Sequence, residues 1–178
     1  MTANIAVRDH GAPVEFSFED MLRYSGPGSP GGVALGLKMM ERAFALLAPD
    51  GLVERREVVI RTAFRGPGAR DACELVTRAV TDGRYVVDLV LERPERGHAL
   101  ATFAFRVGYR DRSVSLLLRE GFVTDEFVRL AQSQGLSPEE RGLFVALKQR
   151  VADQLMASDA VDVFVSPVMV LSRLTPPT

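Results

Sequence analysis

Cysteine and histidine are scarce in this chain: its 178 residues include one cysteine, Cys73, and two histidines, His10 and His98. A single cysteine excludes an intrachain disulfide and any zinc site built on cysteines of one chain. The shortage of histidine also disfavours a serine nucleophile such as Ser29, because that chemistry needs an adjacent base. For Cys73 itself, a small buried apolar role is the simpler interpretation. The alternative is a reactive thiol activated by a helix N-terminus.

No excess of either charge is present, since 22 Lys and Arg face 23 Asp and Glu and the formal net charge is −1. A nucleic-acid or acidic-membrane partner would usually require a clustered basic face, so we expect neither. No apolar stretch reaches the roughly 20 residues of a membrane helix. The N-terminus also lacks the basic and apolar segments of a secretory signal. We therefore expect a cytoplasmic protein.

The composition is that of a globular domain, with 47% apolar and 25% charged residues. A chain of this length predicts one domain with a substantial core. Residues 1–13 show no hydrophobic period, so we expect a flexible N-terminal arm there. The predicted domain covers residues 14–172, and residues 173–178 form a C-terminal tail.

The stretch from Tyr24 to Ala48 organises the rest of the chain. It begins as a Gly- and Pro-rich loop and continues as an apolar helix that starts at Ser29 and Pro30. Serine at the N-cap followed by proline is a strong start signal, because the serine side chain accepts from a free N–H and proline lacks one. A single apolar stripe then predicts a helix face directed at the core. Its members are Val33, Leu37, Met40, Phe44 and Leu47.

A second loop and helix repeat this arrangement. A strand is predicted over Val58–Phe64, Gly66-Pro67-Gly68 interrupts it, and a helix opens at Asp71 and runs to about Ala79. In the first turn of that helix, the positive end of the helix dipole would stabilise the Asp71 carboxylate by a few tenths to about 1 kcal/mol.

The remaining segments predict more strands than helices. Strands are expected at 85–91, 99–109 and 113–118, helices at 124–133 and from Ser137 onward, and a last strand, at a sheet edge, at 161–171. A further short helix, 18–24, is capped by Ser17. The fold class is therefore α+β: a mainly antiparallel sheet with helices packed on one face.

The glycine-rich loop before Val33 is the best candidate for a functional site. It is no P-loop, because no Gly-Lys-Ser/Thr follows Gly32, and it is no dinucleotide fingerprint, because a helix precedes it rather than a strand. A loop that leads into a helix does gather backbone N–H groups, which favours an anion or a carbonyl. A purely structural turn is the alternative. The predicted ligand-binding residues are Ser25, Ser29, Gly31, Gly32 and Arg65, and the predicted catalytic ones are Asp71, Glu74 and Tyr24.

These two loop–helix units resemble a known family. The segment YSGPGSPGGVALG, from Tyr24 to Gly36, is similar to the His-Gly-His-x-Cys-Pro-Gly motif of the FmdE-like family, which is named after a component of formylmethanofuran dehydrogenase. GARDACELVTRAVTDG, from Gly68 to Gly83, is similar to that family's Cys-Gly-x-Asp-Ala-x-Gln segment. The resemblance implies an α+β fold, a pocket between the two units and pairing of two subunits. The stretch from Asp159 to Val165 also suits the family's C-terminal end.

The family's metal ligands are missing from the matching positions. Its two histidines fall on Ser25 and Pro27, and its cysteines fall on Ser29 and Gly68. Proline and glycine offer no side-chain ligand, and zinc prefers thiolate, imidazole or carboxylate to a neutral hydroxyl. We therefore expect neither metal nor other cofactor.

The leading hypothesis is a metal-free member of this fold, a homodimer that binds a small polar or anionic metabolite. Acid–base catalysis would use Asp71 or Glu74, with Tyr24 or Arg65 polarising a carbonyl. A second hypothesis is a non-catalytic accessory subunit of a larger redox or one-carbon enzyme complex. A third places a metal on His98, Asp71 and Glu74.

Overall fold

The computed structural model describes residues 4–175, except for the side chain of Met169. Its strands are β1 (Asn4–Asp9), β2 (Ala12–Ser17), β3 (Val58–Thr62), β4 (Tyr85–Val87), β5 (Ala104–Tyr109), β6 (Arg112–Leu118) and β7 (Phe164–Val170). Its α-helices are α1 (Phe18–Ser25), α2 (Pro30–Leu47), α3 (Pro67–Thr77), α4 (Asp125–Gln132), α5 (Pro138–Ala157) and α6 (Ala160–Val163). Three short 3-10 helices are η1 (Arg55–Glu57), η2 (Leu89–Leu91) and η3 (Pro94–Arg96).

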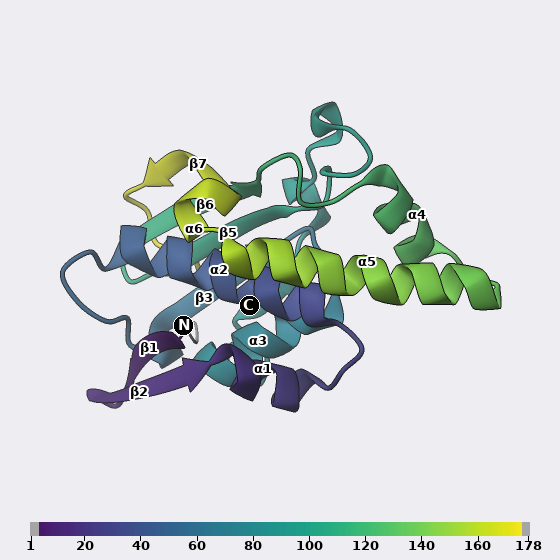
Figure 1. The fold of residues 1–178 in the computed structure, drawn as a ribbon. Helices are drawn as coiled ribbons and strands as arrows, with labels where there is room; N and C mark the ends of the chain where they lie inside the picture. Colours follow the sequence, from purple (N-terminus) through teal and green to yellow (C-terminus); the bar gives the residue numbers. More distant parts are fainter. Residues whose placement is uncertain (1–3, 176–178) are drawn as a thin grey trace.

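The predicted fold class is confirmed. A five-stranded sheet in the order β4-β3-β5-β6-β7 is antiparallel except at one edge. The long helix α2 lies against β5 and β6, with α3 and α5 beside it (Figure 1). On β3 the residues Val58, Ile60 and Thr62 are fully buried, as alternation along a strand requires. No described helix is both long and apolar enough to span a membrane.

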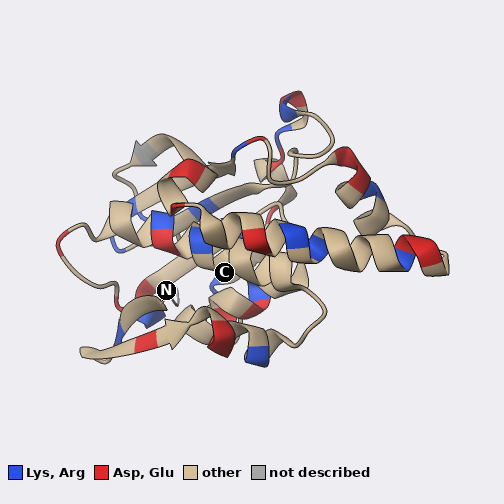
Figure 2. Cartoon of the chain, in the orientation of Figure 1, with Lys and Arg blue, Asp and Glu red and all other residues tan. Residues whose placement is uncertain are grey.

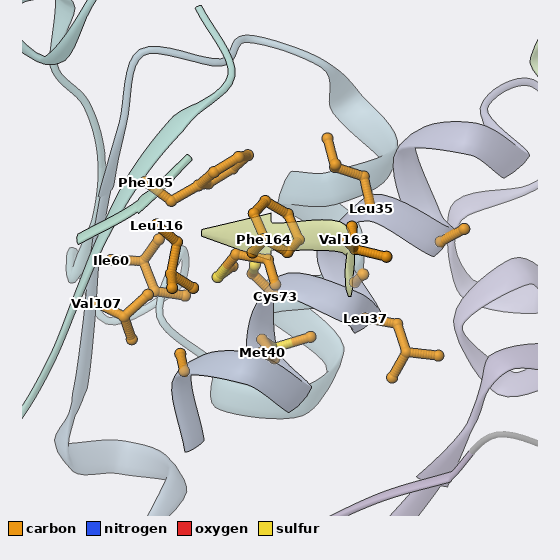
Figure 3. Close-up of a cluster of buried hydrophobic side chains, with 14 of the residues drawn as sticks. Leu35, Leu37, Met40, Ile60, Cys73, Phe105, Val107, Leu116, Val163 and Phe164 are labelled. Carbon is orange, nitrogen blue, oxygen red and sulfur yellow. The ribbon is translucent and has the colours of Figure 1, made fainter. Parts of the chain in front are cut away.

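The helix α2 is the centre of the core. Twelve of its 18 residues are buried, including every member of the predicted stripe. Its side chains Leu35, Leu37 and Met40 lie with Phe105 and Phe164 in the hydrophobic cluster that joins the helices to the sheet (Figure 3). Burial on several sides explains why this helix carries so few charges (Figure 2).

Glycines let α2 and α3 cross at very short distance. A Cβ atom added to Gly68 would lie 2.5 Å from the carbonyl oxygen of Ser29 and 2.8 Å from the backbone nitrogen of Val33. One added to Gly36 would lie 2.9 Å from the Cβ of Ala72. The first turns of the two helices therefore touch backbone to backbone, which brings the two glycine-rich loops side by side.

The prediction of a flexible N-terminal arm is wrong over residues 4–13, whereas residues 1–3 lie outside the part of the chain that the structure describes. Strands β1 and β2 form an antiparallel hairpin. His10 and Gly11 both adopt positive φ, 51° and 82°, the conformation of a two-residue hairpin turn. Their amides donate to the Glu54 carboxylate at 2.8 and 3.0 Å. The overlooked signal was the alternation of Ile5 and Val7, which are 5% and 0% exposed.

The predicted run of three antiparallel strands is also only partly right. The pair β5–β6 is antiparallel as expected, but β4 runs parallel to β3, and α3 connects the two. The segment after β4 turns into η2 rather than continuing as a strand. Residues 99–102 form turns before β5 begins. The hydrophobic pattern predicted where these strands lie in the sequence, but it did not predict which strands pair or in which direction.

At the C-terminus, the strand predicted over 161–171 is confirmed for Phe164–Val170, which forms the edge strand β7 beside β6. The prediction is wrong for residues 161–163, which belong to the helix α6. The predicted tail is wrong where the structure describes it. Leu174 is 7% exposed and lies close to Gly108, and the backbone oxygen of Thr175 accepts from Arg61 Nη2 at 2.8 Å. Residues 173–175 therefore fold back toward the sheet, while residues 176–178 lie outside the described part.

Candidate functional site

A cavity of about 760 Å³ lies where the N-termini of α2 and α3 meet. Its wall includes Ser29 and Gly32 from the first loop–helix unit and Gly66 and Pro67 from the second. Helices α4 and α5 complete it from the other side. Figure 1 shows α4 and the first half of α5 extending past the α2 N-terminus.

Five of the eight predicted site residues line this cavity: Ser25, Ser29, Gly32, Arg65 and Asp71. Ser25 Oγ donates to Asp71 Oδ2 at 2.8 Å, a contact between residues 46 positions apart. Arg65 is exposed and makes no hydrogen bond or ion pair within the described residues. The two units predicted to face each other therefore share one cavity.

The predicted cap by the Ser29 side chain is absent. Ser29 is the N-cap residue of α2, but its ψ angle is 51° and its hydroxyl makes no cap hydrogen bond. At the N-caps Ser17 and Ser137, ψ is 161° and 163°, and both hydroxyls accept from the helix. The backbone angle of Ser29 differs from theirs, and its hydroxyl lies beside Gly32 without making a cap hydrogen bond. This hydroxyl therefore remains able to bind a ligand.

Asp71 also has a different setting from the predicted one. Helix α3 begins at Pro67, with Gly66 as its N-cap, so Asp71 lies in the second turn rather than the first. Stabilisation by the helix dipole falls off within the first turn, so that role does not apply. The carboxylate is held instead by Ser25 and borders the cavity.

Three predicted residues do not line the cavity. Tyr24 is 50% exposed on the outside of α1. Gly31 is buried under α5, where an added Cβ would lie 3.1 Å from the carbonyl oxygen of Lys148. Glu74 is 6% exposed and binds the turn after α3, accepting from the Thr81 hydroxyl and from the amides of Val80 and Thr81. Tyr24 therefore lies on the surface, Gly31 packs against α5 and Glu74 stabilises a turn, and none of the three borders the cavity.

The contacts of Glu74 predict an acid-dependent loss of stability. Burial raises the pKa of its carboxyl, but the hydrogen bonds from Thr81 and Val80 outweigh burial and hold the pKa below the ordinary 4.5. The unfolded chain therefore binds this proton first, and the stabilisation is lost as the pH falls below about 4.5. Glu74→Gln should lower the free energy of unfolding at pH 7 by about 2 kcal/mol. It should also flatten the pH dependence between pH 5 and 3.

Urea denaturation at several pH values measures both effects. The exposed carboxylate variant Glu95→Gln is the matched control and should keep the stability and the pH profile of the wild type. Equal behaviour of the two variants would contradict the assigned role of Glu74.

Sequence reasoning missed the aromatic part of the site. Phe64 and Phe103 have ring centroids 4.7 Å apart, and Phe127 and Phe144 have centroids 5.5 Å apart. All four line the cavity. They come from the loop after β3, the segment before β5, and helices α4 and α5, so no local spacing connects them. Lys148, also in the wall, was missed for the same reason.

Lys148 joins α5 to the first glycine-rich loop. Its Nζ donates to the carbonyl oxygen of Gly28 at 2.9 Å and lies 4.3 Å from the centroid of the Phe144 ring. This position puts a positive charge between the aromatic wall and the loop. Together with Arg65, it gives the cavity two cationic side chains, against the two carboxylates of Asp71 and Glu92.

Within residues 4–175 no three His, Cys, Asp or Glu side chains are grouped so that they could hold an ion. The hypothesis of a metal on His98, Asp71 and Glu74 fails, because Glu74 binds the Val80–Thr81 turn and His98 lies 3.8 Å from Asp125. Gly68, at a family cysteine position, is pressed into the helix crossing.

Cys73 is a buried core residue, as the simpler interpretation predicted. It is 1% exposed on α3 and packs in the hydrophobic cluster (Figure 3). Burial raises the pKa of its thiol far above the ordinary value, and the Glu74 charge raises it further. The thiol is therefore protonated, and the alternative of an activated thiolate is wrong.

No protein-family model matches this chain, and no curated protein matches it. The resemblance to the FmdE-like family therefore stays a prediction from the two motifs. The geometry itself describes a mixed cavity, whose wall contains two helix N-termini, hydroxyl and charged groups, and four phenylalanines.

Proposed function

We propose that this protein binds a small polar or anionic metabolite, without a metal, in the cavity between its two loop–helix units. The proposal keeps the fold relationship suggested by the motifs at Tyr24–Gly36 and Gly68–Gly83. The observation that carries it is the meeting of Ser25, Ser29, Gly32, Arg65 and Asp71 on one cavity wall.

The chemistry of this wall favours a ligand with an acceptor or anionic group. Helices α2 and α3 both begin here, and the first N–H groups of a helix have no partner within it. The Ser29 hydroxyl is unused by its helix, and Arg65 has no ion pair among the described residues. A volume of about 760 Å³ is typical of cavities that take small molecules.

Acid–base catalysis in this cavity would rest on Asp71. Of the three predicted catalytic residues, it alone lines the wall. Its carboxylate accepts from Ser25 Oγ, so a ligand that displaces this hydroxyl would meet a general base at hydrogen-bond distance.

A thermal-shift screen of metabolites tests the binding proposal. A ligand at 100 times its dissociation constant stabilises the folded state by about 2.7 kcal/mol. Arg65→Ala and Asp71→Asn should each weaken the resulting ligand at least tenfold, as measured by calorimetric titration. The matched controls are Arg70→Ala, exposed on α3, and Asp153→Asn, exposed on α5, neither of which lines the cavity. Unchanged affinity in both cavity variants would place the ligand elsewhere.

We propose further that two copies of the chain pair. The first half of α5 exposes two apolar side chains, Leu143 at 41% and Val145 at 65%. Residues two positions apart lie on opposite sides of a helix, so pairing through the face of α5 that carries Val145, the more exposed of the two, would cover that side chain. Sedimentation equilibrium measures the mass directly, and Val145→Lys should shift it toward the monomer. A monomeric wild-type protein at micromolar concentration would contradict the pairing.

An accessory role within a larger enzyme complex is the second candidate. The observation in its favour is η2, which exposes Leu89 at 46% and Val90 at 86% next to the edge strand β4. Affinity purification at native expression levels should then recover a stoichiometric partner from the wild type and lose it with Val90→Asp. Recovery of the chain alone would exclude this candidate.

A further inference from the structure

The four phenylalanines in the cavity wall set the shape of its ligand. They are four of the ten phenylalanines in the chain, and they form two contacting pairs. One pair, Phe64 and Phe103, belongs to segments at the end of the sheet. The other, Phe127 and Phe144, belongs to α4 and α5. Aromatic surfaces therefore reach the cavity from two separate parts of the fold.

Three of these rings are not fully covered by the protein. Phe103 is 4% exposed, whereas Phe64, Phe127 and Phe144 are only partly buried. A partly covered aromatic cluster around a cavity leaves apolar area in water, and a flat ring stacked there would remove it. An aliphatic chain would fill the same space without the favourable geometry of ring against ring.

The charged groups in the wall favour a ligand that carries few charges. Arg65 and Lys148 contribute two positive charges to the wall, and Asp71 and Glu92 contribute two negative ones. This balance disfavours a polyphosphate, whose several negative charges would meet both carboxylates. A single anionic group fits, because Lys148 Nζ lies beside both the Phe144 ring and Gly28.

We propose that the ligand is a monoanionic aromatic acid, with its ring among Phe64, Phe103, Phe127 and Phe144 and its anionic group at Lys148. This inference rests on the proposed binding function and specifies the chemical class of the ligand. The short distance from Lys148 Nζ to the ring of Phe144 places the acid group directly on the ring system rather than on a long spacer.

Three matched probes test the class. They are 2-naphthoate, its saturated counterpart decahydro-2-naphthoate, and the neutral 2-naphthamide, each titrated calorimetrically into the full chain. Binding of 2-naphthoate should be at least tenfold tighter than that of either other probe. Equal affinity for the saturated acid would overturn the aromatic assignment, and equal affinity for the amide would overturn the anionic one.

Variants then assign the preference to residues. Phe144→Leu and Phe64→Leu retain apolar volume, and each should weaken 2-naphthoate at least fivefold while leaving decahydro-2-naphthoate unchanged. Lys148→Met should abolish the preference for the naphthoate over the amide. Phe16→Leu, in the β1–β2 hairpin, and Arg150→Met, exposed on α5, are the controls and should keep the wild-type preferences. Circular dichroism verifies that each variant is folded.

Failure of this inference is distinguishable from failure of the proposed function. An aliphatic or multiply charged metabolite that binds, and loses affinity in Arg65→Ala, would overturn the aromatic acid and retain the cavity. Naphthoate binding that is unaffected by Phe144→Leu, Phe64→Leu, Arg65→Ala and Asp71→Asn would overturn both.

Discussion

Gly68→Ala should lower the free energy of unfolding by about 3 kcal/mol, although it adds one methyl group. The new Cβ would lie 2.5 Å from the carbonyl oxygen of Ser29 and 2.8 Å from the nitrogen of Val33. Both neighbours are backbone atoms of the first turn of α2, so no side chain can rotate to make room. The helices must separate, and the buried contacts along their crossing weaken together.

Urea denaturation of Gly68→Ala and of a second glycine variant provides the measurement. Gly142 lies within α5, and a Cβ added there meets nothing within 4 Å. Gly142→Ala should therefore stabilise the protein by about 0.5–1 kcal/mol, because alanine favours helix over glycine. A similar result for the two variants would show that α2 and α3 do not touch at Gly68.

Gly68→Ala also bears on the cavity, since the same two first turns form part of its wall. Separation of the helices would displace Gly32 and Ser29 relative to Arg65 and Asp71. Ligand affinity should then fall together with stability, whereas Gly142→Ala should leave it unchanged. Gly68 is therefore needed both for the close packing of α2 on α3 and for the geometry of the cavity wall.

Helices were the part of this fold that the sequence predicted best, because their signals are local. Ser17 and Ser137 marked the starts of α1 and α5, and both serines take part in a capping box with the acidic residue three positions later. The helix α4 was also predicted close to its observed bounds, and Thr124 is its N-cap residue. The start of α3 was missed by four residues because Gly66-Pro67-Gly68 was interpreted as a loop alone. Pro67 is in fact the first residue of that helix.

Strand pairing was less predictable, because it joins distant segments. The parallel neighbour of β3 is β4, reached through α3, and nothing in the residues of β4 distinguishes a parallel from an antiparallel partner. The hairpin of β1 and β2 had a local signal, the His10-Gly11 turn between alternating apolar residues. This signal was missed because residues 1–13 were interpreted as having no hydrophobic period.

The candidate site divides in the same way. The glycine-rich loops and Arg65 could be predicted, because they adjoin segments where Gly and Pro mark a helix start. Asp71 was also placed at the cavity, although it lies in the second turn of α3 rather than at its start. Phe127, Phe144 and Lys148 could not, because α4 and α5 reach the cavity only through the tertiary fold. The predicted polar pocket therefore lacked its aromatic wall. Glu74 was predicted to be catalytic because it is an acidic residue near a loop. Its carboxylate instead accepts from the backbone amides of the turn after α3.

Phe164→Ala should lower the free energy of unfolding by about 4 kcal/mol, the largest effect we expect from a single substitution. Phe164 is 0% exposed, and its ring meets that of Phe105 edge to face at a centroid distance of 5.8 Å. It is the first residue of β7 and pairs with Leu118 of β6. Removal of the ring leaves a cavity between the sheet and α2 that these neighbours cannot fill (Figure 3).

Val168→Ala is the matched control, because Val168 belongs to the same edge strand but is 50% exposed. Its cost should stay below about 1 kcal/mol, as for other half-exposed positions. Urea denaturation compares the two variants directly. Equal losses of unfolding free energy in the two variants would mean that β7 contributes only as an edge strand, and that the Phe164 side chain is not needed to complete the core. A loss confined to Phe164→Ala would instead make the last strand part of the same cooperative core as α2, although it follows that helix by more than 100 residues.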